Sequence, residues 1–227
     1  MERKPTEREV SQLIPMSDRL AASLRSMLAY LGLGSRRLEP VDDLASLRQF
    51  LETRASFIAQ TSLYGYLRTR MGMRYPELFD DDPFVVSINV AKWHVWLACL
   101  SDLAVYAGGM LARHPPGHYV ETGRLMQEVV ARILDETGVP DEADAEFPAH
   151  AERVRARIAD CDWTRVTDDE QAFSESPQAV VRWAPIVDEL KQLDEEIVMN
   201  SVRFRWQEVR RDLRQCLDAE AVLRSAP

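Results

Sequence analysis

The segment RYPELFDDDP (Arg74–Pro83) lies between two long stretches of helical pattern, and these three parts of the chain decide the fold. The first stretch runs from about Leu44 to Gly72 and the second from about Phe84 to Arg113. At about 1.5 Å per residue, each helix would be about 45 Å long. The short acidic turn between them ends one helix and starts the next. We therefore predict an all-α fold, an elongated helical bundle built on a long antiparallel helical hairpin.

Seven-residue recurrence supports this hairpin, because it keeps one seam of a long helix facing the same neighbour. The first stretch carries two such rows, which are Phe50, Phe57, Tyr64 and Met71, and Leu51, Ile58, Gly65 and Gly72. The second stretch is apolar nearly all round, apart from a thin row of Ser87, His94, Ser101 and Gly108. Near-complete apolarity indicates burial on several sides. We predict that the second stretch is the central helix of the bundle.

One part of this central helix also has the length of a membrane span. WHVWLACLSDLAVYAGGML (Trp93–Leu111) is 19 residues long, and only His94 and Asp102 in it are ionisable. A carboxylate in the middle of a span costs several kcal/mol in lipid, on the order of 3 kcal/mol or more. The buried helix of a soluble bundle explains the same pattern, and we favour that interpretation.

The last element is a long C-terminal helix. From about Pro185 to Arg224 the chain has no further proline and no glycine. Its apolar residues form two rows on different faces, which are Ile186, Leu190, Leu193, Ile197 and Phe204, and Val198, Val202, Trp206, Val209 and Leu213. The buried side is therefore predicted to change near Met199. The second neighbour of this helix is either another subunit or the N-terminal helices.

We predict a single all-α domain over residues 1–227. It is divided into N-terminal helices (1–40), the long hairpin (41–113), shorter helices and acidic loops (114–176) and the long C-terminal helix (177–227). Asp42 is the predicted N-cap of the first long helix.

Charge and cysteine content exclude several classes of function. The net charge is −9, and residues 79–200 alone carry 10 basic and 24 acidic groups. An acidic middle repels phosphates, so nucleic acid is not an expected partner. The three cysteines, Cys99, Cys161 and Cys216, are far apart, and no CxxC spacing occurs. With a charged N-terminus that lacks an apolar run, this predicts a cytoplasmic protein.

The C-terminal helix provides a candidate partner surface. Its apolar part consists of Val202, Trp206, Val209 and Leu213, and its basic part of Arg203, Arg210, Arg211 and Arg214. A basic amphipathic helix binds anionic membranes or acidic grooves. We favour instead a solvated outer face, paired with Glu208, Asp212 or the acidic middle of the chain, so membrane attachment is possible but disfavoured.

A second candidate site is a pocket between the long helices, lined by Tyr64, His94, Trp96 and Asp102. His94 and Asp102 are eight residues apart, or about 12 Å along a helix, so they do not touch one another. Each is expected to find a partner on a neighbouring helix. The arginines considered for this role are Arg54, Arg68 and Arg70.

His114, His118 and Glu121 are weak candidates for metal ligands, because imidazole and carboxylate groups this close together can coordinate a metal. They lie in a proline-rich turn, and no Glu-x-x-His pair occurs on two helices as a di-iron bundle requires. We therefore expect no metal and no cofactor.

The chain has no glycine-rich phosphate loop, no GxSxG elbow and no HExxH motif. The leading hypothesis is a non-enzymatic interaction or assembly protein that forms a homo-oligomer or binds another protein. The first alternative is a small-molecule-binding protein or enzyme with a pocket between the long helices. The second is a peripheral membrane protein that attaches through its basic C-terminal helix.

Overall fold

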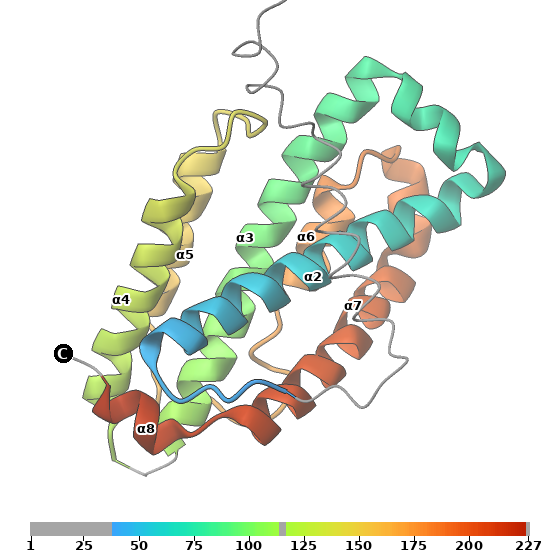
Figure 1. The fold of residues 1–227 in the computed structure, drawn as a ribbon. Helices are drawn as coiled ribbons and strands as arrows, with labels where there is room; N and C mark the ends of the chain where they lie inside the picture. Colours follow the sequence, from blue (N-terminus) through green and yellow to red (C-terminus); the bar gives the residue numbers. More distant parts are fainter. Residues whose placement is uncertain (1–37, 114–116, 226–227) are drawn as a thin grey trace, which may run out of the picture. The chain divides into compact units, whose positions relative to one another are not determined.

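The computed structural model describes residues 38–113 and 117–225. By their contacts, residues Glu39–Pro227 form one compact unit. The described residues contain seven α-helices and one 3-10 helix: α2 (Leu44–Met71), η2 (Gly72–Asp80), α3 (Asp82–Arg113), α4 (Tyr119–Thr137), α5 (Phe147–Ala159), α6 (Ser176–Trp183), α7 (Asp188–Cys216) and α8 (Ala219–Arg224) (Figure 1). The all-α prediction is confirmed. The N-terminal helices predicted before residue 38 lie outside the described residues.

The two long helices and their order are confirmed, and α2 packs against α3. The segment between them is not a short turn, because nine of its residues form η2. Asp43, not Asp42, caps α2: its Oδ1 accepts a hydrogen bond of 2.7 Å from the Ser46 backbone, and Ser46 Oγ accepts one of 3.0 Å in return. This reciprocal pair requires a spacing of three residues, and Asp42 has an alanine at that distance.

Helix α3 is the central helix of the described unit, as predicted. It packs against α2, α4, α5 and α6 (Figure 1). Within the described residues it is also the one helix long and apolar enough to cross a membrane, and its most apolar 18-residue window is completely buried in the bundle. A core helix meets the same criteria of length and composition.

The loop between α5 and α6 crosses α3 closely at two glycines. The Trp163 ring lies against Gly108, and the Val166 side chain lies against Gly109. A β-carbon at either glycine would overlap the residue above it. The two glycines therefore allow this loop to reach the central helix.

The predicted single C-terminal helix is in fact three helices, α6, α7 and α8. Helix α7 ends at Cys216 because the segment before α2 pairs with the chain there. Val41 donates a backbone hydrogen bond of 2.8 Å to Cys216, and Asp218 donates one of 2.9 Å to Val41. These bonds satisfy backbone groups at the helix end, so neither proline nor glycine is needed to stop the helix.

Candidate functional site

The apolar row predicted as a partner surface is buried inside the chain's own bundle. Val202, Trp206, Val209 and Leu213 are each at most 1% exposed. Helix α7 packs against α2 and α6 with this row. The prediction that these four side chains face a partner is therefore wrong, because the row forms part of the core.

The other apolar row of α7 is left exposed. Leu193, Ile197 and Phe204 are 74%, 72% and 71% exposed. Their spacings of four and seven residues place them on one face, opposite the buried row. We call these three residues the α7 stripe. The buried side of α7 does not switch near Met199 as predicted, since a helix at the edge of a bundle buries one face only.

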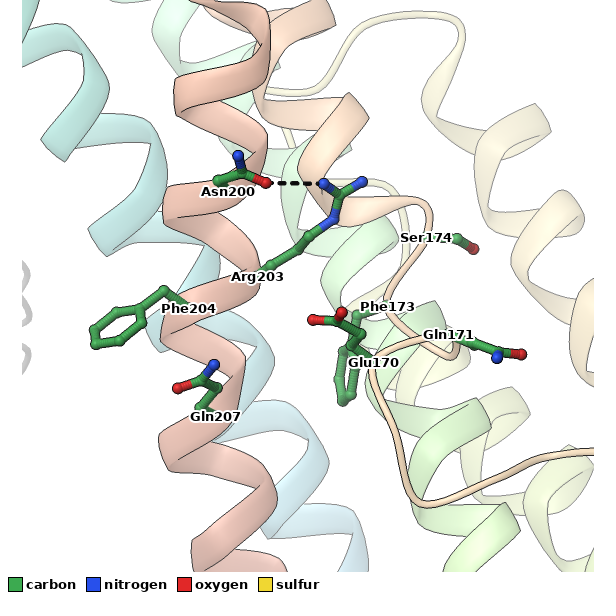
Figure 2. Close-up of a pocket in the computed structure, with 8 residues that line it drawn as sticks. All are labelled: Glu170, Gln171, Phe173, Ser174, Asn200, Arg203, Phe204 and Gln207. Carbon is green, nitrogen blue, oxygen red and sulfur yellow. Dashed lines mark hydrogen bonds between the residues drawn. The ribbon is translucent and has the colours of Figure 1, made fainter.

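An open groove of about 480 Å³ lies beside the α7 stripe, between α7 and the loop before α6 (Figure 2). Arg203 extends towards this loop and donates a hydrogen bond of 3.0 Å to Asn200, whereas the Phe204 ring points away from the loop (Figure 2). The residues that line the groove are both polar and apolar: Glu170, Gln171, Phe173, Ser174, Asn200, Arg203, Phe204 and Gln207. The loop therefore leaves the Phe204 ring uncovered.

The arginines of α7 are mostly engaged by the chain itself. Arg214 donates to both Asp168 carboxylate oxygens at 3.0 and 3.1 Å, and Arg210 donates to the Asp168 backbone at 2.9 Å. Arg211 lies 3.8 Å from Glu208 and 3.5 Å from Asp212. These ion pairs support the outer-face interpretation over a face kept free for a membrane.

Asp168 also fixes its loop to the central helix, since it accepts a hydrogen bond of 2.6 Å from the Tyr106 hydroxyl. Burial first, and then this hydrogen bond to Asp168, raises the pKa of Tyr106 to about 12. Tyr106 therefore stays protonated and remains a donor at neutral pH.

His94, from the predicted pocket, belongs to a polar cluster between α3, α5 and α6. Its Nδ1 lies 2.8 Å from His150 Nδ1, and its Nε2 lies 2.9 Å from Asp144 Oδ1. The Trp183 ring stacks on the His94 ring with centroids 3.6 Å apart. The His94 ring therefore joins a carboxylate through Nε2 and a second imidazole through Nδ1, and the tautomers of the two rings set which of them donates.

Burial is the main cause that lowers the pKa of His150, to about 4 from 6.5. Repulsion from His94, Arg153 and Arg182 adds to the effect, and Asp144 opposes it. His150 is therefore neutral at pH 7.

Asp102 belongs to a second cluster, two helical turns away. One carboxylate oxygen accepts a hydrogen bond of 2.8 Å from Arg157, and the other accepts bonds of 2.7 and 2.6 Å from the Ser176 backbone and hydroxyl. Trp206 donates in turn to Ser176 Oγ at 2.9 Å. Burial raises the pKa of Asp102, and Arg157 and Ser176 partly offset that effect. The carboxylate holds the N-terminus of α6 against the core.

The structure places the four predicted pocket residues in separate contacts. His94 and Asp102 find partners on neighbouring elements, as expected, but the arginine is Arg157 of α5 and not one from α2. Trp96 packs edge-on against Trp93, with ring centroids 5.8 Å apart. Tyr64 is half-buried, and burial is the main cause that raises its pKa.

The residues that contact His94 and Asp102 in the two clusters were not predicted from the sequence. They come from α5, α6 and the loops that precede them: Asp144, His150, Arg157, Ser176 and Trp183. Their spacing along the chain is the signal that links them to His94 and Asp102. The cluster residues are eight apart on α3 and seven apart on both α5 and α6, so helices packed side by side bring them together at two levels.

The weak metal candidates do not form a site in the described part of the chain. His118 Nδ1 lies 4.0 Å from Glu121 Oε2, and both side chains are exposed. His114 lies outside the described residues. Among the described residues, no group of three or more histidine, cysteine, aspartate or glutamate side chains is arranged to hold a metal ion.

Comparison of the chain with protein-family models, with curated proteins and with solved structures finds no match.

Proposed function

We propose that this protein is a non-enzymatic assembly protein that associates with a second copy of itself through the α7 stripe. The observation that carries the proposal is the exposure of Leu193, Ile197 and Phe204 on one face of a helix whose other face is fully packed. Large apolar side chains gathered on one exposed face mark interaction surfaces, whereas single exposed ones are common on any protein.

The stripe is large enough to drive a reversible association. Covering one exposed leucine, isoleucine or phenylalanine contributes about 1.5–3 kcal/mol, and each copy brings three such residues. Loss of translational and rotational freedom opposes this gain by about 4–15 kcal/mol. The net result for a contact of this size is an affinity on the order of micromolar.

Helix α7 adds little to the repulsion between two copies. The chain as a whole has a net charge of −9, so two copies repel each other over most of their surface. Helix α7 carries seven acidic and six basic residues, a net charge of −1. An apolar stripe on a nearly neutral helix is therefore the favoured contact between two acidic chains.

Sedimentation equilibrium of the full-length protein at micromolar concentration tests the proposal. We expect the wild type to show a concentration-dependent dimer and Ile197→Glu to be monomeric, because an unpaired carboxylate in the contact is costly to desolvate. Val120→Glu is the matched control, since Val120 is 65% exposed on α4 and lies outside the stripe. This control is expected to dimerise like the wild type.

Two outcomes contradict the proposal. If the wild type stays monomeric at every concentration, the protein does not self-associate. If Ile197→Glu dimerises as well as the control, the α7 stripe is not part of the contact. Circular dichroism of each variant confirms that the helical fold is kept, and Leu193→Glu repeats the test at a second position.

A further inference from the structure

The charges of α7 are separated along its length. Residues 188–200 carry five acidic residues and one basic residue, a net charge of −4. Residues 201–216 carry five basic and two acidic residues, a net charge of +3. Two copies of such a helix repel one another when parallel and attract one another when antiparallel.

We propose that two copies of α7 pack antiparallel about a two-fold axis at Asn200, with the acidic half of each helix against the basic half of the other. This inference rests on the proposed self-association and specifies its geometry. A two-fold contact is the commonest arrangement of homodimers, and it uses the same surface of both copies.

The apolar stripe fits this axis. Residues equally far before and after Asn200 lie opposite one another in an antiparallel pair. Phe204, four residues after the axis, therefore faces Glu196 of the second copy, on the level between Leu193 and Ile197. An aromatic side chain then fills the space between these two aliphatic ones, as a knob fills a hole in paired helices.

The same axis pairs charges that have no strong partner within one chain. Glu189 lies eleven residues before Asn200 and Arg211 eleven residues after it, so each faces the other across the contact. Within the described residues Glu189 has no ion pair, and the Arg211 side chain is 60% exposed with only long contacts of 3.5 and 3.8 Å. Two equivalent Glu189–Arg211 pairs thus form in each dimer.

Charge reversal tests the orientation with the full-length protein. Glu189→Arg and Arg211→Glu each place like charges opposite one another, so each variant alone is expected to dimerise about threefold to tenfold more weakly than the wild type. An equimolar mixture of the two variants, and the double variant, restore opposite charges at both pairs and regain wild-type affinity. Arg124→Glu, an exposed change on α4, is the control that leaves dimerisation unaltered.

Disulfide trapping tests the position of the axis. Two copies of Asn200→Cys meet at the axis and are expected to cross-link on mild oxidation. Gln215→Cys is the control, because its two copies lie about 45 Å apart along the helices. The wild type, with its three free cysteines, gives the background.

The two proposals fail in different ways. In one outcome the wild type dimerises and Ile197→Glu disrupts the dimer, but the mixture shows no rescue and position 200 does not cross-link. The assembly function then stands, and the antiparallel geometry is overturned. A wild type that is monomeric throughout overturns both.

Discussion

Gly108 shows how the lack of a side chain sets the distance between two segments. The Trp163 ring occupies the space that a β-carbon of Gly108 would need. The sequence marks this position only as a weak point in an apolar helix, because the tryptophan that covers it comes from a loop 55 residues further along the chain. Long-range packing, and not the local pattern, explains this glycine.

We expect Gly108→Ala to destabilise the fold by about 1–3 kcal/mol, since the added methyl group forces the Trp163 ring away from α3. Gly65→Ala is the matched control. Only the flexible end of Arg205 lies near Gly65, so the alanine is accommodated and gains about 0.5–1 kcal/mol of helix preference. Urea unfolding of both variants measures the difference, and equal stability would show that Trp163 does not pack tightly on Gly108.

Asp102 is the residue whose loss we expect to be most costly. Asp102→Ala leaves the buried Arg157 contact and the backbone at Ser176 without their acceptor, which costs about 3–5 kcal/mol. The control is Asp135→Ala, because Asp135 pairs with Arg155 at the surface and its loss costs less than about 1 kcal/mol. Chemical unfolding compares the two. Similar losses for both would mean that the Asp102 cluster does not hold α6 in place.

At the scale of elements, the sequence predicts the long helices well and their ends less well. Helices α2, α3 and α4 follow apolar patterns that span several turns, and such patterns depend on local spacing alone. The end of α7 depends on Val41, which precedes it by 175 residues, so no local pattern marks it. The row that α7 buries is likewise decided by its neighbours, since both rows are apolar.

The start of α2 gives a test at this scale. Asp43→Ala removes the acceptor for the Ser46 backbone, and we expect it to lower Tm by about 2–4 °C. Asp42→Ala changes the adjacent acidic residue and is expected to leave Tm unchanged, because its side chain does not cap the helix. Thermal unfolding, monitored by circular dichroism, measures the Tm of both variants. A larger loss of Tm for Asp42→Ala than for Asp43→Ala would mean that Asp42 caps the helix, as predicted from the sequence.

At the scale of the whole molecule, the two polar clusters connect the same three helices at two levels. The sequence shows one member of each, His94 and Asp102, because a polar residue is conspicuous in an apolar helix. It does not show the other members, which lie on amphipathic elements where polar residues are ordinary. The burial of the row predicted as a partner surface was missed for a related reason, since exposure is a property of the packed bundle.

The His94 cluster makes the stability of the molecule depend on pH. The pKa of His150 is about 4 in the folded chain, against 6.5 for the free side chain. Between these two values the unfolded chain binds a proton at His150 and the folded chain does not, so stability present above pH 6.5 is lost as the pH falls towards 4. We expect a loss of about 2 kcal/mol after allowance for the partial exposure of His150.

Urea unfolding at several pH values between 7 and 4 measures this loss. His150→Gln removes the titrating group, so the slope of stability against pH becomes shallower in this window, whatever the variant costs at pH 7. His118→Gln, at an exposed histidine outside the cluster, is the matched control. If the wild type and His150→Gln lose stability in parallel, then the fold does not hold His150 in its neutral form. Protonation would then leave the contact between α3 and α5 intact, and the acid sensitivity would have to come from the carboxylates that titrate at lower pH.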